Sequence, residues 1–85
     1  MNHYCTPDTD LDELIGRERL HEGSFAFHYG PISRALKQDE ELVLENSAVL
    51  SVTMLAKIRV VVRGLFIPET EEELHPGGGF SLIFR

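Results

Sequence analysis

Three cationic side chains stand close together in the segment KIRVVVR, at Lys57, Arg59 and Arg63. Successive side chains of a strand point to opposite faces, so on a strand these three would share one face. The intervening apolar side chains would line the other face and enter the core: Ile58, Val60 and Val62. A row of cations about 20 Å long can bind phosphate groups or a run of carboxylates. We therefore take Lys57, Arg59 and Arg63 as the candidate partner-binding residues.

Three uses of this basic strip remain open. Glu41 and Glu45 lie on one face of the alternating segment ELVLE with a matching period, so the cations can pair internally or between subunits. Opposite charges across neighbouring strands stabilise a sheet by roughly 0.2–1 kcal/mol per pair. The other two uses are binding of nucleic-acid phosphates and binding of an acidic protein.

Residues for catalysis or metal binding are sparse. His3 and Cys5 could begin a metal site, with His21 or His28 added, but structural zinc sites use tighter, paired spacings. A nucleophile needs a base within hydrogen-bond reach, and Cys5 lies in a segment that we expect to be a dispensable tail. Most carboxylates fall in exposed charge runs. We expect no enzyme activity, no metal and no cofactor.

The triple glycine at 77–79 also lacks the context of a phosphate-binding loop. Such a loop joins a strand to a helix whose first amides point at the anion. Here the glycines lead into FSLIFR, whose alternating apolar residues predict a strand. The glycines are interpreted as a connection between strands.

Hydrophobic patterns predict the elements that must position these residues. Thr9 can cap a short helix from about Asp10 to Ile15, which we expect to fray towards His21. Alternation of apolar residues predicts strands in 24–30, 41–45, 57–63, 65–67 and 80–85. Residues 32–37 fit either a helical turn or a short strand, and 38–41 are expected to form an exposed turn. For 48–57, a strand that bends is favoured over a helix capped by Ser47.

These elements predict a mainly β (α+β) fold. We expect a small β-roll or barrel of about five short strands with one short N-terminal helix. Turn-forming residues near the N-terminus predict a flexible arm over 1–9, followed by a single β-rich domain over 10–85. An apolar terminal strand is an exposed edge that invites another copy of the chain, so a homo-oligomer is expected.

Composition narrows the class of protein. Fourteen acidic and eight basic residues in 85 give a net charge of −6, which opposes long-range attraction to nucleic acid and to anionic membranes. Cys5 is the only cysteine and the N-terminal residues lack a signal-peptide pattern, so a cytoplasmic location is expected and no membrane association. We predict a non-enzymatic interaction or regulatory protein that binds a protein partner through a β-edge or a charged face. The alternative is an oligomeric nucleic-acid-binding regulator that uses the Lys57–Arg63 strip.

Overall fold

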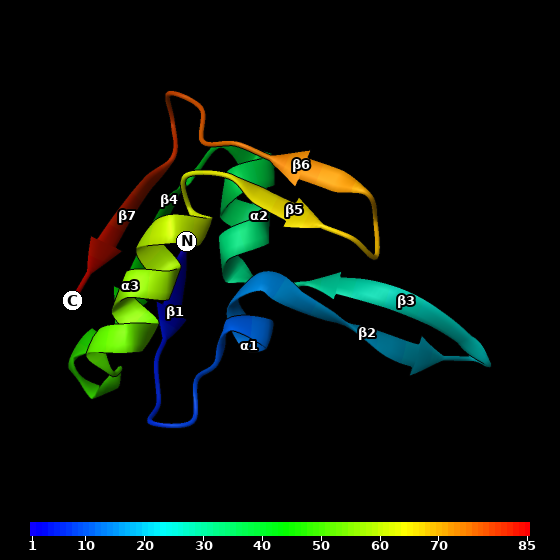
Figure 1. Cartoon of the computed structure of the whole chain (residues 1–85), viewed down its shortest axis with the longest axis horizontal. Coiled ribbons are helices and arrows are strands. Elements are labelled where there is room, and N and C mark those ends of the chain that lie inside the picture. Colours follow the sequence, from blue (N-terminus) through cyan, green and yellow to red (C-terminus); the bar gives the residue numbers. More distant parts are fainter.

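A sheet of three parallel strands lies towards one end of the molecule, at the left of Figure 1. The computed structural model describes residues 1–85. The strands are β1 (Asn2–Tyr4), β4 (Glu41–Glu45) and β7 (Ser81–Phe84), in the order β1–β4–β7. Val43 of β4 is aligned with Asn2 on one side and with Ile83 on the other. The central strand is therefore ELVLE, and both terminal segments of the chain are edges.

Three α-helices and one 3₁₀ turn accompany the sheet: α1 (Leu11–Ile15), α2 (Pro31–Gln38), η1 (Ser47–Val49) and α3 (Val52–Val61). The N-cap of α1 is Asp10, whose side chain accepts a hydrogen bond from the backbone N–H of Glu13 at 2.8 Å. Ser51 caps α3 in the same way, through the N–H of Met54 at 3.0 Å. Pro31 starts α2 at a position where its missing N–H costs no helical bond.

The core lies between one face of the sheet and the helices. Leu42 and Leu44 of β4 are fully buried and pack in one cluster with Ile32 of α2 and Ile58 of α3. Leu82 and Phe84 of β7 border the same cluster. Alternate residues of a strand face opposite sides, so Tyr4, Val43 and Ile83 lie on the face turned away from the helices. Tyr4 is 67% exposed there.

Two separate hairpins extend from this body: β2 (Gly16–His21) with β3 (Ser24–Tyr29), and β5 (Leu65–Ile67) with β6 (Glu72–Leu74). The first turns at Glu22 and Gly23, both with positive φ, the backbone that a tight hairpin turn requires. Figure 1 shows that this hairpin projects well beyond the rest of the molecule.

A polar cluster fastens the second hairpin to the body. Lys37 Nζ of α2 lies 2.6 Å from Glu72 Oε2 of β6. The hydroxyl of Tyr29 in β3 donates to the other oxygen of the same carboxylate. The Lys37 ammonium also lies 4.2 Å from the centre of the Tyr29 ring. One carboxylate thus joins α2, β3 and β6.

The structure is α+β, which confirms the expected class in outline, but it corrects the expected architecture. A single β-roll or barrel of five strands is wrong, because the strands form three separate sheets and none of them closes. The helix expected to fray towards His21 gives way at Gly16 to strand β2, and the ambiguous 32–37 segment belongs to α2.

The N-terminal segment is also not a loose arm. Residues Asn2–Tyr4 pair with β4 over a sequence separation of about 40 residues, and the N-terminal amine donates to the Glu41 carbonyl at 3.1 Å. Cys5 is fully buried in the core cluster. Cys5 therefore does not lie in a loose tail, and we expect it to contribute to the stability of the fold.

Candidate interaction surfaces

The three candidate partner-binding residues do not form a strip. Residues 52–61 are helix α3, so the strand favoured for this region is wrong, and the cations leave the helix in different directions. Arg59 lies over the Phe84 ring, 5.1 Å from its centre, and Lys57 borders a groove beside α1. Arg63 follows the helix and is exposed. None of the three makes an ion pair with Glu41 or Glu45, so the expected internal pairing is absent.

An apolar groove runs between α1 and α3. Its volume is about 470 Å³, and its lining residues are Leu11, Thr53, Ala56, Lys57, Val60 and Val61. Val60 is 66% exposed, and Val52 on the same helix is 84% exposed. A helix that is apolar on several faces is normally buried on all of them, whereas only Ile58 of α3 is buried here. The outer side of α3 is a surface suited to another molecule.

The outer edge of β7 is a second surface. In a parallel pair of strands, the backbone N–H and C=O groups of every second residue point to the same neighbouring strand. The Arg85 N–H donates to the Leu44 carbonyl at 3.0 Å, so the backbone groups of Arg85 point towards β4. Ile83 therefore faces β4 as well, whereas the N–H groups of Leu82 and Phe84 point outwards. Neither outward group has a hydrogen-bond partner in the structure. The residues of β7, SLIF, include no charge and no proline that would block an added strand.

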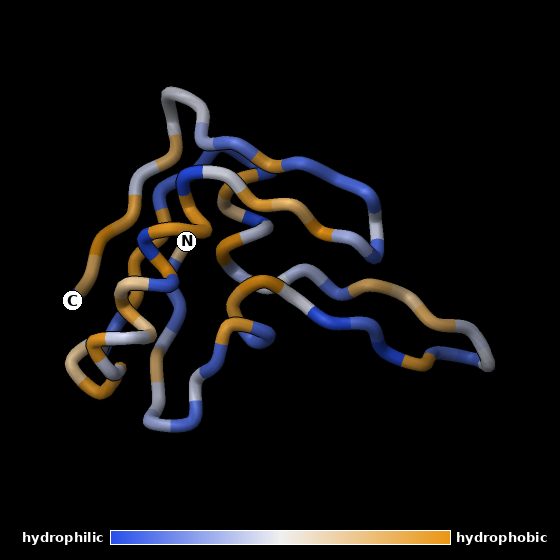
Figure 2. The backbone as a smooth tube through the Cα atoms, viewed as in Figure 1, coloured by the Kyte–Doolittle hydropathy of each residue, from blue (hydrophilic) through white to orange (hydrophobic).

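The β2–β3 hairpin is a third surface, with two different faces. Leu20 is aligned with Phe25 across the hairpin, and these side chains are 65% and 72% exposed. The opposite face carries Arg17, Arg19 and the side chain of His28. The two strands also differ from each other, because Figure 2 shows a largely hydrophilic β2 beside a more apolar β3.

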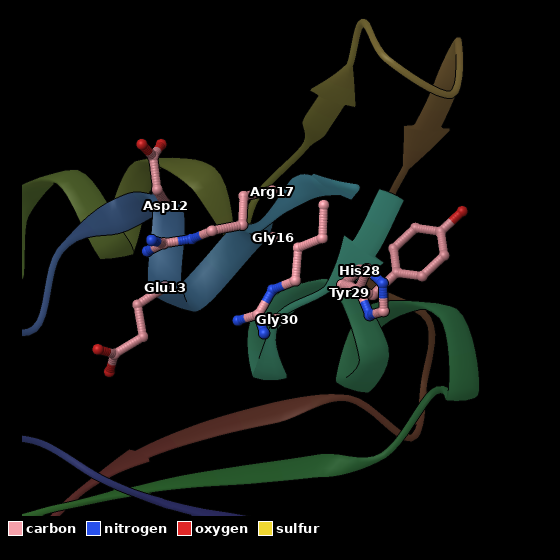
Figure 3. A pocket seen from close by; sticks show the side chains of 8 residues that line it. Asp12, Glu13, Gly16, Arg17, His28, Tyr29 and Gly30 are labelled. Atoms are coloured by element: carbon pink, nitrogen blue, oxygen red, sulfur yellow. The ribbon is translucent and has the colours of Figure 1, made fainter. Parts of the chain in front are cut away.

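A cavity of about 250 Å³ opens at the base of this hairpin (Figure 3). Arg17, Arg19 and His28 line it together with two carboxylates, Asp12 and Glu13. The two arginines are balanced by the two carboxylates, so the cavity is not a strongly positive anion site. No serine, cysteine or lysine that could act as a nucleophile is among its lining residues.

The strand alternation of Arg17 and Arg19 was missed in the sequence. The segment GRERLH was assigned to the fraying end of a helix, although the following Glu22-Gly23 is a turn signal between two alternating runs. Reading that turn first would have revealed both the hairpin and its cationic face.

His3 and Cys5 do not form a metal centre with the other histidines. His3 Nε2 lies 2.8 Å from Glu13 Oε2, which also accepts a hydrogen bond from Thr9 at 3.2 Å. No group of three or more histidine, cysteine or acidic side chains is arranged to hold a metal ion. Burial, and then the charge of Glu13, raises the pKa of the Cys5 thiol, which disfavours the reactive thiolate.

The triple glycine forms the connection into β7. The backbone N–H of Gly79 donates to the carboxylate of Asp39 at 3.0 Å, and a side chain at Gly77 or Gly79 would collide with Asp39. The glycines allow this close approach, which aligns β7 beside β4. Their interpretation as a strand connection is confirmed.

Comparison with protein-family models and with curated proteins gives no match for this chain. None of its helices has both the length and the apolar character needed to cross a bilayer. The candidate surfaces therefore rest on the geometry alone.

Proposed function

We infer that the protein is a non-enzymatic interaction protein, which binds a macromolecular partner by accepting a strand of that partner on the free edge of β7. It works as a homo-oligomer in a reducing compartment such as the cytoplasm. The observation that carries this proposal is the pair of unpartnered N–H groups of Leu82 and Phe84 on an uncharged edge strand.

The chemistry of strand addition fits this edge. Main-chain hydrogen bonds supply the affinity, and side chains of alternate residues supply the specificity. Ile83 lies on the face turned away from the helices, where a strand added beside β7 could place its own side chains. Tyr4 lies on the same face but on β1, at the opposite edge of the sheet. On this face Tyr4 is exposed and Ile83 is partly exposed, whereas the central Val43 is buried, so the accessible part of the face lies along its edges.

The test compares two lysine substitutions on the same open face. A lysine on an edge strand opposes strand addition. Wild type, Ile83→Lys and Tyr4→Lys are immobilised and exposed to nuclease-treated extract of the cells that make the protein. We expect at least one protein to be retained by wild type and Tyr4→Lys but not by Ile83→Lys. Equal retention by all three, with unchanged melting temperatures, would contradict the use of the β7 edge.

A nucleic-acid-binding regulator is the second candidate. Because Lys57, Arg59 and Arg63 are dispersed, the observation that favours it is now the exposed pair Arg17 and Arg19 on one face of the projecting hairpin. Phosphate contacts weaken steeply with added salt. Retention on DNA or RNA that falls with salt and is lost in an Arg17→Ala/Arg19→Ala variant would support this candidate over the first.

A further inference from the structure

We propose that copies of the chain assemble by placing the tip of the β2–β3 hairpin of one copy in the α1–α3 groove of the next. This inference rests on the homo-oligomeric part of the proposed function. It names the two surfaces that meet, and it is independent of the β7 edge.

The hairpin tip has the character of an inserting element. Leu20 and Phe25 are directly opposite each other on one face, and both are more than three-fifths exposed. A two-stranded hairpin by itself is marginally stable in water, and here both of its outer edges are unpaired. Aromatic residues of this kind commonly anchor interfaces when they enter an apolar pocket.

The α1–α3 groove has the character of the receiving element. Small and apolar residues such as Ala56 and Val60 form its floor and walls, and Lys57 is the one charged residue among its six lining side chains. Figure 1 shows the β2–β3 hairpin running away from α3, so the tip cannot reach the groove of its own chain. The occupant must come from another molecule.

Charge complementarity points to a second copy as that molecule. Glu18 shares the hairpin face of Leu20 and Phe25, and Glu22 lies at the turn. The segment 46–68, which contains α3, has no acidic residue, and its Lys57 makes no ion pair within the chain. Docking the tip would bring a glutamate to this lysine while the apolar side chains fill the groove.

The contact is between two different patches of the chain, so each copy offers both a tip and a groove. Stable interfaces bury roughly 1,200–2,000 Å² in total. A reciprocal pair, with two such contacts, approaches that area better than a single contact does. Assembly through one contact should therefore be weaker than assembly through both.

The test uses one variant with a charge placed in the apolar tip and another with a charge placed in the apolar groove. Phe25→Asp and Val60→Asp replace exposed residues, so both proteins should melt as the wild type does. We expect wild type to form an assembly of at least twice 9.6 kDa by light scattering, and each variant alone to be monomeric. An equimolar mixture should form a one-to-one heterodimer, because one intact tip and one intact groove remain. Phe66→Asp, at an exposed aromatic of β5, is the matched control and should assemble as the wild type does.

Charge reversal provides a second readout that does not depend on the apolar substitutions. Lys57→Glu should weaken assembly at least tenfold in dissociation constant, and Glu18→Lys in the same chain should restore part of the loss. Because the mixture of Phe25→Asp and Val60→Asp keeps only one contact, it is measured at concentrations well above those at which the wild type assembles. A mixture that still associates no more than either variant alone would overturn the proposal, as would a Phe25→Asp protein that assembles normally. Ile83→Lys should leave assembly unchanged, so failure of this inference can be told apart from failure of the β7 edge.

Discussion

Lys37 and Glu72 lie 2.6 Å apart, from Nζ to Oε2, and this ion pair joins α2 to the second hairpin. The carboxylate also accepts the Tyr29 hydroxyl of β3. The consecutive elements β3 and α2 are thereby joined to β6, which lies about 40 residues further along the chain. Because Glu72 belongs to β6, loss of the ion pair should loosen the attachment of the β5–β6 hairpin to the body of the fold.

Glu72→Gln should lower the melting temperature at neutral pH. Hydrogen bonds from Lys37 and then Tyr29 hold the pKa of Glu72 at about 2, below its ordinary 4.5. A carboxyl whose pKa is lower in the folded state stabilises the fold above its unfolded pKa and loses that contribution as the pH falls towards the folded pKa. The difference between wild type and variant should therefore shrink between about pH 4.5 and about pH 2. Thermal unfolding of wild type and Glu72→Gln across this pH range checks the prediction, with Glu73→Gln as the control. A difference in melting temperature that does not depend on pH would argue against the account.

Cys5→Ser should destabilise the protein. Cys5 is fully buried in the core, and a buried hydroxyl without a partner costs about 1–3 kcal/mol. For a domain of this size, that corresponds to a fall in melting temperature of at least about 4 °C. Cys5→Ala removes the sulfur without adding a polar group and should lose less. Equal melting temperatures for wild type and the serine variant would place Cys5 outside the core.

The Cys5 thiol should also resist alkylation in the native protein. Burial and the charge of Glu13 both raise its pKa, so little thiolate is present and access is blocked. We expect slow reaction with iodoacetamide in buffer and rapid reaction once denaturant is added. Fast labelling of the folded protein would indicate that β1 detaches from β4.

Arg59→Ala and Arg63→Ala should differ in their effects on stability. Arg59 lies over the Phe84 ring, and an exposed contact of this kind contributes about 0.5–1 kcal/mol. Arg63 has neither an ion pair nor an aromatic contact, so its substitution should leave the melting temperature unchanged. Denaturant titration of both variants distinguishes them. Equal losses of stability in the two variants would mean that Arg59 and Arg63 take part in the same stabilising contact.

Local pattern was sufficient for several elements. Alternating residues correctly predicted β4 in ELVLE and β7 in SLIF, and the acidic start of LDELI correctly predicted α1. In each case the period of the apolar residues matches the element, and no distant contact is needed to choose it.

The other elements depend on contacts that the pattern does not contain. Val52, Val60 and Val61 disfavour a helix, yet the cap at Ser51 and burial of Ile58 make α3 helical. β1 is only three residues long and becomes a strand by pairing with β4. Once 52–61 is a helix, Lys57, Arg59 and Arg63 cannot form one row, so the predicted basic strip was lost together with the predicted strand.

Hydrogen exchange at the amides of β7 tests the central claim, that this edge is free to accept a strand. In the isolated protein, the amides of Ile83 and Arg85 should be protected by β4, and those of Leu82 and Phe84 should exchange much faster. When the protein retained by the wild type but not by Ile83→Lys is added, Leu82 and Phe84 should become protected. Slow exchange of Leu82 and Phe84 before any partner is added, or no change on binding, would contradict the account.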